Sequence, residues 1–223
     1  MQGIVAMINI LYEDNHLLVV EKPINIPVQA DSSKDDDLLT ILKRYIKEKY
    51  SKPGNVYLGL IHRLDRPVSG IMVFAKTSKC ASRLSKQIVD GSFQKTYYAV
   101  VEGKINKIGE YKDKLLKNSH NNTVEVNENG KEAILNYCLI KYNEGKSLVK
   151  INLQTGRSHQ IRVQFSYHGY PLYGDHRYNK KCDKKSQIAL FAQSLTFKHP
   201  ISQEKMTFSL PLPKRFPWNI FGG

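Results

Sequence analysis

A single carboxylate lies among cationic side chains in the segment 61–76, which reads I-H-R-L-D-R-P-V-S-G-I-M-V-F-A-K. Asp65 has Arg63 and Arg66 on either side, and His62 is close by in the chain. Neighbouring guanidinium groups favour the ionised form of a carboxyl group. Asp65 therefore suits a nucleophile, or a base toward a weakly acidic C–H, better than a general acid. The simpler alternative is a surface loop in which two arginines solvate an aspartate.

A second basic group occupies the segment 155–165, which reads T-G-R-S-H-Q-I-R-V-Q-F. Ser158 suits a helix N-cap, and the following residues suit a short helix. His159 and Arg162 are three residues apart and would share one face of that helix. On its own, this pattern is compatible with an anion site at a helix N-terminus or with an exposed basic turn.

Apolar runs on both sides of the Asp65 segment predict two buried strands that position it. One run covers 56–61 and the other covers 71–75. Pro67, Ser69 and Gly70 supply turn-forming residues between them. A charged cluster between two core strands would be held rigidly, as catalysis requires.

The remaining pattern predicts two longer helices and a series of strands. One helix starts at a cap on Asp36 or Asp37, and the other starts at Thr77 or Ser78 and ends at Gly91. Strands are predicted at 4–11, 17–20, 93–101, 132–142, 146–154, 188–197 and 206–210. The polar stretch 108–131 is expected to be a loop-rich connection, with or without a short strand. The class is therefore α+β with a large, mainly antiparallel sheet, and residues 1–223 are expected to form one domain.

The charge balance indicates a polyanionic partner. The chain has 34 basic and 20 acidic residues and a formal charge of +14, which favours nucleic acid or an anionic membrane surface. The apolar run within 1–10 is too short for membrane attachment, so we expect no membrane association and a cytoplasmic location.

Metal binding and disulfides are not expected. Cys80, Cys138 and Cys182 are odd in number and lack a C-x-x-C spacing, which indicates reduced thiols. No carboxylate or cysteine lies at ligand spacing beside four histidines considered as metal ligands, namely His62, His159, His168 and His176.

Three motifs together resemble the RluA-type pseudouridine synthases. H-R-L-D followed by S-G and an apolar run ending in A-K is similar to the family motif that contains the catalytic Asp, here Asp65. K-x-Y at 95–97 resembles a second motif, and G-R-x-H-Q-x-R ending at Arg162 resembles a third. The resemblance covers nearly the whole chain. The sequence departs from the family at Val68, Asn25 and Gln29, where Thr, Gly and His are common.

The resemblance implies an enzyme that converts uridine in structured RNA to its C-glycoside isomer without a cofactor. It implies a bent mixed sheet, flanked by helices and loops, with an active-site cleft across its middle. Asp65 would be catalytic, Tyr97 would lie against the target base, and Arg162 would pair with Asp65. Arg63 would enter the space vacated by the flipped base. The residues expected to bind substrate are His62, Arg63, Leu64, Arg157, His159, Gln160 and Ile161.

The expected partner is a stem-loop of ribosomal or transfer RNA bound by a monomer, because no S4-like module is evident in the sequence. Two alternative functions make different demands on the sequence. A non-catalytic RNA-binding protein would be expected to lack Asp65, Tyr97 or Arg162, and all three are present. A nucleoside or glycoside hydrolase usually needs a second carboxylate with a raised pKa, and none is evident. Whether Asp65 attacks C1′, adds to C6 or removes the 2′ proton stays open.

Overall fold

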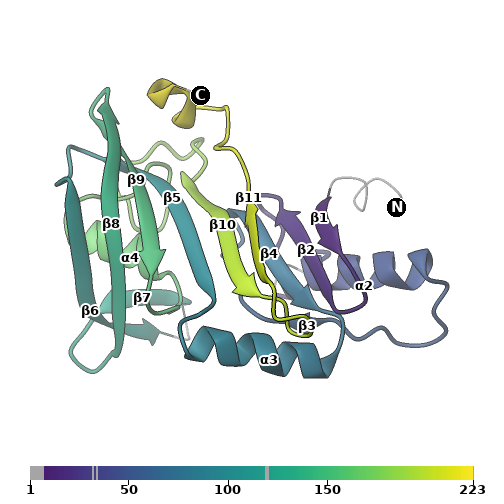
Figure 1. The fold of residues 1–223 in the computed structure, drawn as a ribbon. Coiled ribbons are helices and arrows are strands. Elements are labelled where there is room, and N and C mark those ends of the chain that lie inside the picture. The colour runs from purple at the N-terminus through teal and green to yellow at the C-terminus, as the bar shows by residue number, and fades with distance from the viewer. Residues whose placement is uncertain (1–7, 32, 34, 119–120, 223) are drawn as a thin grey trace. The chain divides into compact units, whose positions relative to one another are not determined.

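The computed structural model describes residues 8–31, 33, 35–118 and 121–222, which form two compact units (Figure 1). The first unit consists of the described residues of Met1–Gln94 and Ser194–Leu210. The second consists of those of Lys95–Gln193 and Pro211–Gly223. Strand registers within the units are antiparallel, so the expected α+β class with a mainly antiparallel sheet is confirmed.

The Asp65 segment lies between β3 (Gly59–Leu60) and β4 (Ser69–Ala75), two of the five strands of the first unit's described residues. The other three are β1 (Asn9–Glu13), β2 (Leu17–Lys22) and β11 (Lys205–Ser209), which pairs with the end of β10 (Leu190–Lys198). β1 and β2 correspond to the strands predicted at 4–11 and 17–20 and form a hairpin, although residues 4–7 lie outside the described residues. The strand predicted at 56–61 is confined to two residues, because only Gly59 and Leu60 pair with β4.

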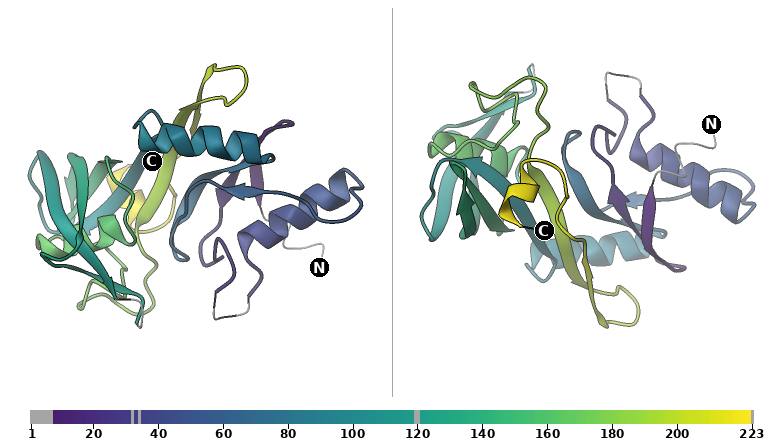
Figure 2. Two further views of the ribbon diagram at one scale, coloured as in Figure 1. Left: turned by 90° about the horizontal axis from the view of Figure 1, so that it is seen from below. Right: turned by 90° about the horizontal axis from the view of Figure 1, so that it is seen from above.

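Two helices cover opposite sides of β2 and β4 (Figure 2). They are α2 (Leu38–Lys49) and α3 (Ser78–Val89). Residues 17–20 of β2 and 71–75 of β4 are apolar and buried on both faces of the strands, which requires a covering layer on each side. The predicted caps are confirmed, since the side chain of Asp37 accepts from Thr40 N and that of Thr77 accepts from Cys80 N.

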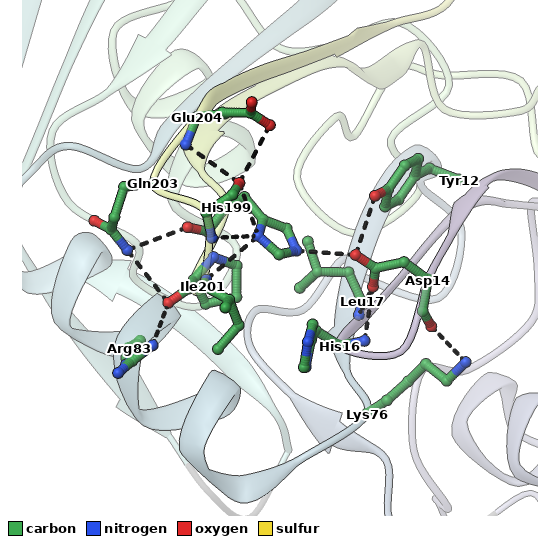
Figure 3. A network of polar contacts seen from close by, with 12 residues as sticks. Tyr12, Asp14, His16, Leu17, Lys76, Arg83, His199, Ile201, Gln203 and Glu204 are labelled. Atoms are coloured by element: carbon green, nitrogen blue, oxygen red, sulfur yellow. Dashed lines mark hydrogen bonds and ion pairs between the residues drawn. The ribbon is translucent and has the colours of Figure 1, made fainter.

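A polar network joins the turn between β1 and β2, the residue after β4 and the turn between β10 and β11 (Figure 3). His199 Nδ1 accepts the backbone N–H of Ser202 at 3.0 Å, so the proton lies on Nε2, which donates to Asp14 at 2.9 Å. Lys76, which follows β4, donates to the carbonyl of Asp14 at 2.6 Å. Glu13, next to Asp14, accepts hydrogen bonds from Tyr45, Lys49, Tyr50 and Lys76.

The second unit is an antiparallel sheet with the strand order β5, β9, β8, β6, β7. These strands are β5 (Gln94–Glu102), β6 (Ile108–Asn118), β7 (Thr123–Val126), β8 (Lys131–Asn143) and β9 (Lys146–Leu153). The strands predicted at 132–142 and 146–154 are confirmed as β8 and β9, which form a hairpin with Glu144 and Gly145 at φ 47° and 72° in its turn.

The prediction of a loop-rich connection over 108–131 is wrong, because β6 and β7 form a hairpin there. Only every fourth residue of β6 is deeply buried, at Tyr111 and Leu115, and the other positions are mostly charged. A strand with one wet face and few apolar residues carries a weak pattern in the sequence. Residues 119–120 of this stretch lie outside the described residues.

Helix α4 (Gln160–Tyr167) packs on β6 and β7, and η1 (Trp218–Phe221) lies near the end of the chain. Val163 of α4 joins a buried cluster with Leu115, Val124 and Ala133. The expected cap at Ser158 is wrong, since the N-cap is His159 in the left-handed region, at φ 51°, without a side-chain capping bond. No helix in the described part of the chain is both long and apolar enough to cross a membrane.

Candidate active site

Asp65 is half-buried on a tight turn that leads into β4. The N–H of Val68 donates to the carbonyl of Asp65 at 3.0 Å and closes the turn. Ser69 and Gly70 already belong to β4, so the turn lies earlier than the sequence predicted. The Val68 side chain is 1% exposed, so this departure from the family pattern places a methyl in the core where a hydroxyl is common.

Lys22, at the end of β2, ties this turn to the sheet. Its side chain is fully buried, and its Nζ donates to the carbonyls of Pro23, Arg66 and Val68 at 2.9, 3.0 and 2.8 Å. Burial lowers the pKa of the Lys22 amine to about 7, while the negative charge of Asp65 opposes this shift. Three acceptors match the three N–H groups of an ammonium. The ammonium group of Lys22 therefore fixes the backbone of the turn that carries Asp65.

Arg66 points away from this tether and binds the acidic stretch before α2. Its side chain pairs with Asp31 at 3.5 Å and with Asp35, and its Nε donates to the carbonyl of Asn25 at 3.2 Å. Asn25 adopts φ 64°, so it reproduces the left-handed backbone that a Gly would supply. Gln29, the third departure from the family pattern, is exposed.

The other predicted residues of this segment differ in exposure. His62 is buried, and its Nε2 accepts the N–H of Val73 at 3.2 Å, so its ring supports the β4 backbone. Leu64 is buried in the core, whereas Arg63 is exposed and accessible to a ligand. Contacts of these residues with RNA stay predictions.

In the second unit, Tyr97 lies in the middle of β5 and is 6% exposed. It pairs with Ile151 of β9, and the alternation of the strand places it on the same face as Lys95. A tyrosine at such a position is held by the sheet and has little rotational freedom.

Arg162, in α4, forms a buried bidentate ion pair with Asp175. Its Nε and Nη2 donate to the two carboxylate oxygens at 2.8 and 2.7 Å. Asp175 is 1% exposed and also accepts the N–H of Arg177 at 3.1 Å. A guanidinium has five N–H groups, so Asp175 orients Arg162 without exhausting its capacity for a second carboxylate.

The turn before α4 is organised by Gln160, which is 3% exposed. Its Oε1 accepts from Thr155 Oγ1 and from the N–H of Arg157, and its Nε2 donates to the carbonyl of Ile134. These hydrogen bonds stabilise the start of α4, the role expected of Ser158 as an N-cap. Ile161 is buried in the core. Gln160 and Ile161 thus have clear structural roles, and substrate contacts by them stay predictions.

His159, the N-cap of α4, contacts Tyr178. His159 Nδ1 lies 2.7 Å from the Tyr178 hydroxyl, which also accepts the N–H of Val124 at 3.0 Å. Burial raises the pKa of Tyr178. His159 and Tyr178 thus share one hydrogen bond, and the tautomer of the imidazole decides which of the two is the donor.

The sequence reasoning missed Lys22 and Asp175 as members of the candidate site. Both lie outside the three motifs that carry the family resemblance, and the sequence pattern assigns no chemistry to them. A lysine directly before Pro23 at a strand end looks like a solvated residue. Within the described residues, no group of three or more His, Cys, Asp and Glu side chains is placed to hold a metal ion.

Comparison with known proteins places this chain in a family. Residues 16–167 match the model described as RNA pseudouridylate synthase. The chain is 33% identical to ribosomal large subunit pseudouridine synthase C of Buchnera aphidicola subsp. Schizaphis graminum, over 93% of this chain and 68% of the relative. It is 34% identical to ribosomal large subunit pseudouridine synthase D of Zymomonas mobilis, over 93% and 70%. It is also 34% identical to the uncharacterized RNA pseudouridine synthase YjbO of Bacillus subtilis, over 93% and 73%.

Two solved structures share the fold. Human RNA pseudouridylate synthase domain containing 4 matches with a TM-score of 0.77 at 20% identity, over 92% of this chain and 89% of that one. Human RNA pseudouridylate synthase domain containing 1 matches with a TM-score of 0.76 at 24% identity, over 96% and 86%.

The chain belongs to the RNA pseudouridylate synthase family. The resemblance to RluA-type pseudouridine synthases is thereby confirmed. Pseudouridine synthases are isomerases, so the assignment favours this enzyme class over a hydrolase or a non-catalytic RNA-binding protein.

Proposed function

We propose that this protein isomerises uridine to pseudouridine in ribosomal RNA and that Asp65 is its catalytic residue. The observation that carries the proposal is the Asp65 turn, in which the family motif sits on a backbone tethered by three hydrogen bonds from buried Lys22. Two of the relatives are named for the large ribosomal subunit, which supports ribosomal RNA as the substrate.

In the proposed reaction the bond between N1 and C1′ breaks, the uracil rotates, and C5 bonds to C1′. The C5 proton leaves and N1 gains a proton, so the composition of the RNA does not change. Asp65 acts on the nucleotide as an anion, and Tyr97 lies against the uracil, where it is the candidate to remove the C5 proton. By the family resemblance, Arg162 holds the charge of Asp65, and the bidentate grip of Asp175 supports this role by fixing the plane of the guanidinium.

Recognition is proposed to rest on charge and on local RNA shape. The formal charge of +14 supplies affinity that does not depend on RNA sequence. The target base must leave its stack, which costs a few kcal/mol and is cheapest in a loop. A stem-loop bound by a monomer is therefore the proposed substrate complex, and Arg63, which is exposed beside the Asp65 turn, is the proposed side chain for the vacated space.

The test replaces Asp65 with asparagine, which removes the charge and nucleophilicity of one side chain and keeps its shape. Pseudouridine in a large-subunit ribosomal RNA transcript is detected by carbodiimide labelling and primer extension. Asp65→Asn should bind the transcript like wild type and form no product. Asp90→Asn, at an exposed turn after α3, is the matched control and should be fully active. Turnover by a clean Asp65→Asn preparation would remove Asp65 from the mechanism.

A further inference from the structure

Lys95 is a largely buried cation beside the turn that leads into α4. A Cβ atom added to Gly156 would lie 3.3 Å from Lys95 Nζ, so the ammonium group lies against the backbone of this turn. Across residues 8–31, 33, 35–118 and 121–222, no side chain or carbonyl forms a hydrogen bond or ion pair with Nζ, and burial alone lowers the pKa of the Lys95 amine. Nothing in the described protein offsets the cost of burying this charge.

The position of Lys95 relates it to the candidate site in the same unit. Lys95 and Tyr97 are two residues apart in β5, so their side chains lie on one face of the sheet. Gly156 and Arg157 are exposed, so a ligand can reach the ammonium group from this turn.

The groups around this position select an anion. Arg157 is cationic, and its Nε is oriented by a 2.8 Å hydrogen bond to the carbonyl of Glu132. Thr155 Oγ1 and the N–H of Arg157 are already engaged by Gln160. The turn therefore presents two cations, and the absence of a side chain at Gly156 leaves room for a bulky tetrahedral group to approach Nζ.

We propose that Lys95 binds a backbone phosphate of the RNA, next to the nucleotide whose base meets Tyr97. This inference rests on the proposed function, because phosphate is the only anion that an RNA substrate presents. A point-charge ammonium contacts a phosphate without reading sequence. Lys95 thus sets the position of the RNA backbone relative to Tyr97.

The experiment measures RNA affinity at several salt concentrations for the wild type, Lys95→Met, Lys95→Arg and Lys150→Met. The probe is a large-subunit ribosomal RNA transcript. Lys150 is the matched control because it is half-buried in the neighbouring strand β9, and it faces the opposite side of the sheet, where it pairs with Tyr98. Both methionine variants lose one positive charge and keep a long side chain.

Lys95→Met should lower the slope of log affinity against log salt by about 0.7 to 0.9, the value for one phosphate contact. Its affinity at low salt should fall about tenfold, as expected for a charged hydrogen bond. Lys95→Arg should restore the slope, and Lys150→Met should match the wild type. The melting temperature of Lys95→Met should equal or exceed that of the wild type, because an uncompensated buried charge is removed.

Three results would overturn the inference. Lys95→Met could equal Lys150→Met in slope and affinity, or Lys95→Arg could fail to restore the slope. Lys95→Met could also melt earlier than the wild type, which would show that the ammonium stabilises the fold. If the wild type makes pseudouridine and Lys95→Met has the same salt slope as the wild type, only this inference is refuted. A wild type that neither binds nor modifies the transcript would refute the proposed function as well.

Discussion

Replacing Lys22 with methionine should separate the positioning of Asp65 from the stability of the fold. Methionine fills a similar volume but leaves the carbonyls of Pro23, Arg66 and Val68 without their donor. Each buried carbonyl that loses its partner costs about 1–3 kcal/mol, which makes about 6 kcal/mol for three.

The same substitution removes the cost of burying an ammonium group. Burial lowers the pKa of the Lys22 amine from 10.5 to about 7, which corresponds to about 4 to 5 kcal/mol at neutral pH. The two effects nearly cancel, so we expect the unfolding free energy to fall by only about 1 to 2 kcal/mol. The turn that carries Asp65 nevertheless loses its tether and a buried cation near the carboxylate.

Activity should respond much more strongly than stability. A displacement of about 1 Å in a catalytic group costs about a hundredfold in rate, so kcat of Lys22→Met should fall by about that factor. Urea unfolding gives the stability, and single-turnover pseudouridine formation on a ribosomal RNA transcript gives the rate. Lys76→Met is the control, because Lys76 is also buried but binds Glu13 and Asp14 instead of the Asp65 turn. It should lose stability and keep its kcat. Wild-type kcat in Lys22→Met, or an equal loss in both variants, would refute the reasoning.

Substitutions at three other residues test single features of the two units. Burial alone would raise the pKa of Glu13, but hydrogen bonds from two lysines and two tyrosines lower it from 4.5 to about 2. Glu13 therefore contributes stability that is complete above about pH 4.5 and is lost as the pH falls toward 2. In Glu13→Gln the unfolding free energy, measured by urea unfolding, should lose this pH dependence. The contribution that disappears should be about 2 kcal/mol after solvent screening. Arg162→Lys should keep part of the activity and Arg162→Met almost none, because Lys keeps the charge but loses the planar fork that binds Asp175. Equal single-turnover rates for the Lys and Met variants would contradict this role. His199→Ala should lower the unfolding free energy by about 2 kcal/mol through loss of its bond to Asp14, without changing kcat.

Local features of the fold could be predicted from the sequence because their causes lie within a few residues. The caps at Asp37 and Thr77 each bind a backbone N–H three residues ahead. The turn at Glu144 and Gly145 needs only two residues with positive φ. The turn that carries Asp65 was also recognisable, because its motif is contiguous.

Features that depend on distant partners could not be predicted in this way. His199 and Asp14 form their bond across 185 positions of the chain. Arg162 and Asp175 are closer in sequence, but the spacing alone does not show that a turn brings them together. The sequence misplaced the α4 cap for the same reason. The side chain of Gln160 holds the turn before α4 by donating to the carbonyl of Ile134, which lies in β8.

The roles assigned to Lys22 and Lys95 follow from the acceptors around each ammonium group rather than from burial, which both lysines share. Lys22 has three carbonyl oxygens within 3.0 Å, which is the full set that an ammonium can satisfy. A group that is already satisfied gains nothing from a ligand, so its role is to hold the backbone that supplies those oxygens. For Lys95 the described residues supply no acceptor, and burial acts on its pKa without any opposing charge. Such a group is stabilised only when an anion arrives, and in an RNA-modifying enzyme that anion is a phosphate.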